Sequence, residues 1–170
     1  LFQEKIKIEE GETAGELHDK MKTAGATLLL KTVREIEDRT QRGEPLPLIV
    51  QEESRVSHAP KIFKETCRVR WDEPAQKIHN LVRGLSPYPA AFAILVNEGR
   101  QYQLKIFSAA TEPGKTVTPG AVDSDGKTSL KVQCAEGCLV LLEIQLEGKK
   151  RMRAEEFLRG FKMAEDCHFI

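Results

Sequence analysis

The sequence predicts an α+β protein in which a small antiparallel β-barrel with flanking helices follows a shorter strand–helix segment. Two patterns indicate this fold. A long stretch near the start repeats apolar residues at helical spacing, and the second half alternates short apolar runs with turn residues. The composition, 40% hydrophobic and 31% charged, is usual for a globular domain. The 170 residues can form one medium domain, or one domain and a piece of another.

The first segment is expected to be one strand and one long helix. Residues 3–8 alternate polar and apolar side chains, as a strand does. Thr13 and Glu16 then have the spacing of a capping box, and an amphipathic helix of roughly 25 residues follows. Gly25 inside this helix predicts a close packing contact, because a helical glycine costs about 1 kcal/mol relative to alanine.

One strand and one helix are too little to bury a core, and the chain opens inside the predicted strand without an initial Met. We therefore expect residues 1–40 to be the C-terminal tail of a larger domain. Residues 41–60 are polar and contain one glycine and three prolines, which predicts an interdomain linker.

A second domain is expected over residues 61–170. It begins with an extended segment that ends at Trp71, the only tryptophan, which we interpret as a core anchor rather than a surface for stacking bases. Asp72 is expected to cap a helix over residues 73–85, with Pro74 in its first turn.

The remainder of this domain predicts five short strands separated by turn residues, and a closing helix. We expect the strands at 91–96, 102–107, 116–122, 128–134 and 138–146, the turns at Gly99, 123–126 and 135–137, and the helix at 154–163. Strands of this number and length suggest an OB-like barrel.

Composition also argues against several classes of protein. No apolar run approaches the ~20 residues of a membrane span, and no signal peptide is present. The four cysteines lack the spacing of a disulfide framework, which favours an intracellular, cytoplasmic protein with reduced thiols. Cys134 and Cys138 flank a short turn, but no second Cys/His pair follows at zinc-site spacing, so we predict paired barrel thiols and no metal.

The charges are unevenly distributed although the formal net charge is zero. Residues 1–60 have a net charge of −3 and residues 61–170 a net charge of +3. The densest cationic stretch, here called the basic corner, follows a predicted strand and precedes a predicted helix; it consists of Lys149, Lys150, Arg151 and Arg153. Such a stretch, held by structure on both sides, predicts contacts with RNA phosphates, and the alternative is a solvated turn.

A second group, here called the N-terminal basic cluster, consists of Lys61, Lys64, Arg68 and Arg70. In extended chain Arg68 and Arg70 share one face, because side chains alternate. These residues are either phosphate contacts or ordinary surface charge. Aromatic residues make up only 6% of the chain, which favours recognition of the backbone and shape of a folded RNA over stacking on single strands.

Five segments together resemble the C-terminal half of methionyl-tRNA formyltransferases. They are TAGELHDKM at 13–21, APKI at 59–62 leading to Arg70 and Trp71, IHNLVRGLSPYPAAF at 78–92, Pro119-Gly120, and GKKRMRAEEFLRG at 148–160. The resemblance covers nearly the whole chain. Tyr88 and Ala90 depart from the Trp and Gly that are common in the family, and Arg153 stands at the predicted helix N-cap, where Ser is common.

The resemblance implies an enzyme that transfers a formyl group from 10-formyltetrahydrofolate to methionyl-initiator tRNA in translation initiation. Residues 1–40 would then end a Rossmann-like catalytic domain, and the OB-like barrel would contact the tRNA. The family's His-x-Ser-Leu-Leu-Pro catalytic motif has no counterpart here, and the only asparagines are Asn80 and Asn97. We therefore assign no catalytic, cofactor-binding or metal-binding residue and expect the chain alone to be inactive.

The expected partners are initiator methionyl-tRNA and the missing N-terminal catalytic domain. One alternative is another folate-dependent enzyme, such as a sugar-nucleotide formyltransferase or the hydrolase part of formyltetrahydrofolate dehydrogenase. Another is a free-standing OB-like RNA-binding or scaffold protein. The basic sequence motif at 148–160 argues against another folate-dependent enzyme. The strand–helix segment at the start argues against a free-standing protein.

Overall fold

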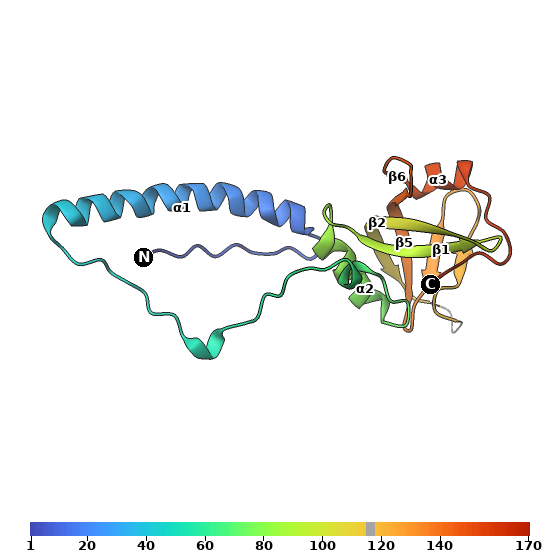
Figure 1. Ribbon diagram of the computed structural model, residues 1–170, viewed down its shortest axis with the longest axis horizontal. Coiled ribbons are helices and arrows are strands. Elements are labelled where there is room, and N and C mark those ends of the chain that lie inside the picture. The colour runs from blue at the N-terminus through green and yellow to red at the C-terminus, as the bar shows by residue number, and fades with distance from the viewer. Residues whose placement is uncertain (115–117) are drawn as a thin grey trace. The chain divides into compact units, whose positions relative to one another are not determined.

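A computed structural model describes residues 1–114 and 118–170. The chain divides into two compact units, Leu1–Lys61 and Ile62–Ile170 (Figure 1). The first contains the long helix α1, and the second contains the β-sheet with helices α2 and α3.

Helix α1 (Ala14–Arg42) begins at the predicted capping box. The backbone N–H of Thr13 donates to the Glu16 carboxylate at 2.8 Å, and the Glu16 N–H donates to the Thr13 hydroxyl at 3.3 Å. The helix ends at Gly43, whose φ of 65° is the left-handed conformation that glycine adopts most easily. A Cβ on Gly25 would meet no atom within 4 Å, so the described chain does not make the close contact predicted at that glycine.

Residues 3–8 do not form the predicted strand. They belong to no strand in the described chain, because a strand needs a hydrogen-bonded neighbour and no sheet is present in this unit. Residues 41 and 42 still belong to α1, so the predicted linker begins inside the helix. The rest of 41–60 contains one short 3-10 helix, η1 (Glu53–Arg55), and the whole range is exposed.

The second unit is built on one antiparallel sheet. Its strands are β1 (Ala91–Asn97), β2 (Arg100–Glu112), β3 (Val122–Ser124), β4 (Leu130–Gln133), β5 (Cys138–Leu146), β6 (Met152–Arg153) and β7 (His168–Phe169). The order is β3-β4-β5-β2-β1-β7, with β6 beside β5. Ala121 forms an antiparallel bridge with His168, and the Phe169 N–H donates to the Gly120 carbonyl at 2.8 Å. The two ends of the sheet therefore meet, and the sheet is a nearly closed barrel (Figure 1).

The predicted α+β fold with an antiparallel barrel is confirmed, and β5 has the predicted bounds. The predicted turn at 123–126 lies later, because β3 extends to Ser124 and the Asp125 carboxylate accepts N–H groups from Lys127, Thr128 and Ser129. The predicted strand at 116–122 lies partly outside the described residues, and only Val122 of its described part belongs to a strand.

The helices differ from prediction at their ends. Helix α2 (Ala75–Leu85) has Pro74 at its N-cap, so Asp72 is not its cap. The Asp72 carboxylate accepts hydrogen bonds from the Arg70 guanidinium instead. Helix α3 (Ala154–Gly160) ends earlier than expected, and the chain after it leads to β7. His168 is part of that strand.

The core lies inside the barrel and under α2. Helix α2 buries Ala75, Ile78, Val82 and Leu85, which repeat at steps of three and four. Trp71 is buried, as predicted for a core anchor. Strand β2 shifts register against β5 between Ile106 and Ala109. Ile106 belongs to the core cluster, whereas the neighbouring Phe107 is buried but lies outside that cluster.

Candidate nucleic-acid interface

The basic corner lies on the hairpin that joins β5 to β6. Gly148 has a φ of 74°, and the Lys149 N–H donates to the Leu146 carbonyl at 2.9 Å. The Gln145 side-chain amide donates to the Lys149 carbonyl at 2.8 Å. These bonds fix the backbone of the turn, while the side chains of Lys149 and Lys150 are exposed. The turn therefore presents two lysines from a hydrogen-bonded backbone.

Arg151 differs from these lysines because it has partners within the barrel. Its guanidinium forms an ion pair with Glu143 and lies 4.4 Å from the centroid of the Phe107 ring. Phe107 is only 8% exposed, so the arginine covers a large aromatic side chain. Among the described residues, Arg151 of the basic corner is thus paired with a carboxylate of the same domain, unlike Lys149 and Lys150.

Arg153 is the N-cap of α3, as the sequence predicted, and its side chain makes no capping hydrogen bond. It is exposed and lies opposite Glu143 across the β5–β6 pair. Arg is a poor N-cap, since its side chain accepts no hydrogen bond from the first turn. Its side chain therefore projects into solvent from a fixed position.

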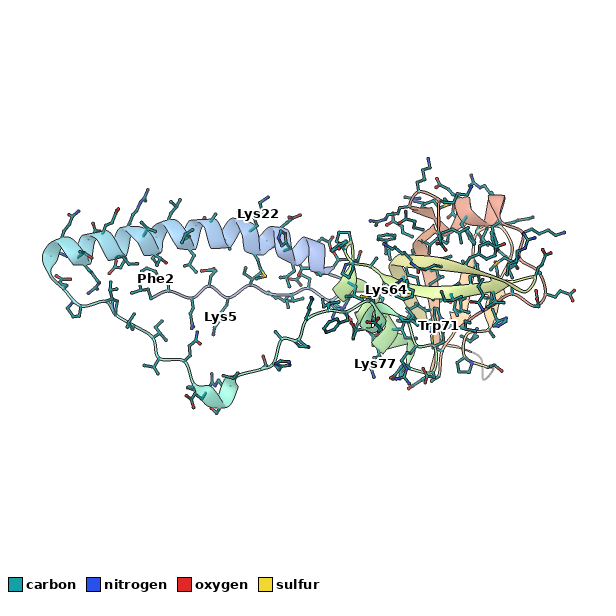
Figure 2. All side chains as sticks on the ribbon, in the orientation of Figure 1. Phe2, Lys5, Lys22, Lys64, Trp71 and Lys77 are labelled. Atoms are coloured by element: carbon teal, nitrogen blue, oxygen red, sulfur yellow. The ribbon has the colours of Figure 1, made fainter. Side chains whose placement is uncertain are left out.

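The N-terminal basic cluster is divided between the two units. Lys61 ends the first unit, and Lys64, Arg68 and Arg70 belong to the second. Lys64 lies on the segment that leads into the barrel (Figure 2), just before the short 3-10 helix η2 (Glu65–Cys67). This 3-10 turn interrupts the extended chain expected over 61–71.

Arg68 and Arg70 are exposed on either side of the buried Val69, which is the alternation expected of extended chain. The hydrogen bond and charge of Arg70 lower the pKa of the Asp72 carboxyl, and Asp72 raises the pKa of Arg70. Arg68 has no such carboxylate partner among the described residues, and it forms a β-bridge with Phe92 of β1.

Sequence reasoning missed one basic residue of this surface. Lys105 lies directly opposite Phe92 across the β1–β2 pair, and Lys64 Nζ lies 5.9 Å from the Phe92 ring centroid. No local signal distinguishes Lys105 from any other strand lysine. Only the strand register places it beside the two groups of basic residues.

The cysteines do not resemble a metal centre. All four thiols are free and buried, and burial raises the pKa of Cys134 to about 11. The Cys138 thiol donates to the Pro113 carbonyl at 3.7 Å. Across residues 1–114 and 118–170, no group of three or more His, Cys, Asp or Glu side chains is arranged to hold a metal ion.

No helix in the described part of the chain is both long and apolar enough to cross a lipid bilayer.

A family model described as formyl transferase, C-terminal domain, matches residues 61–162. The chain therefore belongs to the formyl transferase C-terminal domain family.

The curated relatives include methionyl-tRNA formyltransferase of Bacteroides fragilis, which is 40% identical over 171 aligned residues. That alignment covers 97% of this chain and 51% of the relative. The methionyl-tRNA formyltransferase of Syntrophomonas wolfei is 39% identical, with 96% of this chain and 50% of the relative covered. The chain thus spans about half the length of the curated relatives that it matches.

Among solved structures, the chain is similar in fold to HypX from Aquifex aeolicus in complex with tetrahydrofolic acid. The TM-score is 0.52 and the sequence identity 20%, with 80% of this chain and 24% of the HypX chain covered. At this identity the likeness concerns the fold alone.

Proposed function

We propose that this chain is the C-terminal portion of a methionyl-tRNA formyltransferase and that its barrel contacts the tRNA. The whole enzyme would transfer a formyl group from 10-formyltetrahydrofolate to methionyl-initiator tRNA in the cytoplasm. The observation that carries the proposal is the match of nearly the entire chain, at 40% identity, to an enzyme of that name. Membership of the formyl transferase C-terminal domain family supports it.

In this proposal residues 1–40 end the catalytic domain, 41–60 are the linker, and 61–170 are the tRNA-contacting domain. Helix α1 has no buried residue in this chain, and Leu29 and Leu30 are 64% and 61% exposed. Exposed leucines on a helix of this length fit an element whose packing partner lies in another part of the protein. The catalytic groups and the folate site would lie in that part.

The tRNA contacts are proposed at the basic corner and the N-terminal basic cluster. Lys149, Lys150 and Arg153 are exposed, are held on a fixed hairpin, and form no ion pair among the described residues. Such side chains meet phosphate oxygens without reorganising the protein. These contacts would hold the tRNA in place and carry little sequence information.

The test is the salt dependence of binding to initiator tRNA by the 170-residue chain. Each phosphate contact that is removed should reduce the slope of log affinity against log salt by about 1. Changing Lys149, Lys150 and Arg153 to Gln should therefore flatten the slope by about 3. An unchanged slope would contradict the assignment of these residues. Absence of salt-dependent binding by the unmodified chain would contradict a role in tRNA contact.

A second assay concerns the whole enzyme. The 170-residue chain should form no formyl-methionyl-tRNA from 10-formyltetrahydrofolate, and the chain joined to a relative's N-terminal half should form it. Formylation by the isolated chain would contradict the expectation that the catalytic groups lie elsewhere.

A further inference from the structure

The two basic groups lie far apart in sequence, but strand pairing connects them. Arg68 forms a β-bridge with Phe92, Phe92 pairs with Lys105, and Lys105 pairs with Gln145. We call these four residues the outer row. Directly paired residues place their side chains on the same face of a sheet, so the four side chains lie side by side.

The side chains of this row lie on the outer face of the sheet, and the half-buried Phe92 also packs against core residues. The sequence neighbours of its members, including Val69, Ala91, Leu104 and Ile144, are buried within the barrel. Because side chains alternate along a strand, the residues between them point outward. Arg68 is exposed, and Phe92, Lys105 and Gln145 are half-buried.

The row ends at the basic corner. The Gln145 side-chain amide donates to the Lys149 carbonyl at 2.8 Å, so the last member holds the backbone of the lysine turn. At the other end, Lys64 Nζ lies 5.9 Å from the Phe92 ring centroid. Neighbouring strands are about 4.8 Å apart, so the row alone spans about 14 Å.

The cations along this path are available to a ligand. In the part of the chain that the structure describes, Arg68, Lys105 and Lys149 form no ion pair, whereas Arg70 and Arg151 do. The row contributes two unpaired cations and an aromatic ring, and Lys149 adds a third cation at its end. Such a path suits the phosphate backbone of RNA in charge and in length.

We infer that Lys64 and Arg68 of the N-terminal basic cluster, Lys105, and Lys149 of the basic corner form one continuous RNA-backbone track across the barrel, with Lys105 as its central phosphate contact. This inference rests on the proposed function, since it assigns a further contact to the same ligand.

Salt-dependent binding of the 170-residue chain to initiator tRNA, between about 50 and 200 mM salt, tests the inference. Lys105→Gln keeps most of the side-chain stem and should flatten the slope by about 1, and Lys105→Arg should restore it. The matched control is Lys127→Gln, an exposed lysine in the β3–β4 turn and outside the row, which should leave the slope unchanged.

The outcomes separate the inference from the proposed function. If Lys149→Gln flattens the slope and Lys105→Gln does not, the continuous track is overturned and the proposed function stands. If the unmodified chain shows no salt-dependent binding, the tRNA role itself is overturned, and the track with it.

An acetylation footprint of the unmodified chain gives the same test without a variant. Initiator tRNA should protect Lys64, Lys105 and Lys149 from acetylation and leave Lys127 reactive. Equal acetylation of Lys105 with and without tRNA would overturn the inference.

Discussion

The ring of Trp71 packs on the ring of Phe169, with centroids 5.3 Å apart and planes inclined by 51°. Trp71 lies before α2, and Phe169 is the penultimate residue of the chain, so this contact joins the two ends of the barrel unit. The same strand, β7, pairs with β1 on one side and meets Gly120 and Ala121 on the other. The last residues of the chain therefore close the barrel.

Removing the Phe169 ring, and with it the contact with Trp71, should destabilise the barrel. Phe169→Ala removes a ring that is 2% exposed, and such a change costs about 3–5 kcal/mol. Urea unfolding followed by the fluorescence of Trp71, the only tryptophan, measures the loss. Ile170→Ala is the control, because Ile170 is 43% exposed and should change the midpoint far less. Equal midpoints for the two variants would contradict the role of Phe169.

Gly120 should not tolerate a side chain. Its φ is +88°, and a Cβ would overlap the carbonyl oxygen of Phe169, which is backbone of the closing strand. Gly126 has a φ of +70° and open space around it, so Gly126→Ala should cost only the left-handed strain of about 1–2 kcal/mol. Gly120→Ala should cost at least twice as much in the same urea experiment. A smaller cost at Gly120 than at Gly126 would show that the closing strand moves aside freely.

Asp125 should make the barrel sensitive to acid. Hydrogen bonds from the Ser129 N–H, the Thr128 hydroxyl and the Lys127 and Thr128 N–H groups lower its pKa below the ordinary 3.8. A carboxyl whose pKa is lower in the folded state stabilises that state above its unfolded pKa. This stabilisation is lost as the pH falls below the ordinary value towards the folded pKa.

The stability lost between pH 7 and acid should therefore be smaller in Asp125→Asn than in the unmodified chain. Thermal unfolding at a series of pH values measures it, and Asp123→Asn is the comparison in the neighbouring strand β3. An identical acid dependence of Asp125→Asn and the unmodified chain would exclude Asp125 as its source.

Substitutions of Arg151 and Lys150 should have different effects, the first on the stability of the barrel and the second on RNA binding. Arg151→Gln loses the ion pair with Glu143 and the contact with Phe107, and surface interactions of these kinds are together worth about 1 kcal/mol. We expect it to lower stability with little change in the salt slope of tRNA binding. Lys150→Gln should do the reverse, because the lysine is exposed and forms no ion pair among the described residues. A flatter salt slope for Arg151→Gln than for Lys150→Gln would reverse these roles.

Local signals in the sequence predicted several elements correctly. The capping box at Thr13 and Glu16 fixed the start of α1, and the turn at Gly99 separates β1 from β2 as expected. The apolar run from Cys138 to Leu146 is β5. Each of these features depends on residues a few positions apart, so sequence spacing is sufficient to find it.

Other predictions failed where a distant or competing partner decides the structure. Asp72 has the spacing of a helix cap, but it pairs with Arg70. Residues 3–8 have the alternation of a strand, but the described chain offers them no neighbouring strand. Strand β7 was missed because two residues give no periodic signal, and its partners lie far away in sequence.

The candidate interface also has features that the sequence predicts and features that only the fold reveals. The sequence by itself identified the basic corner, because four cations within five positions are visible without a fold, and it indicated the family through its motifs. Only the tertiary structure showed that Arg151 covers Phe107 and that Lys105 lies between the two basic groups. The physical reason is strand register: hydrogen bonding between β1, β2 and β5 brings side chains about 5 Å apart that are separated by tens of residues in the chain.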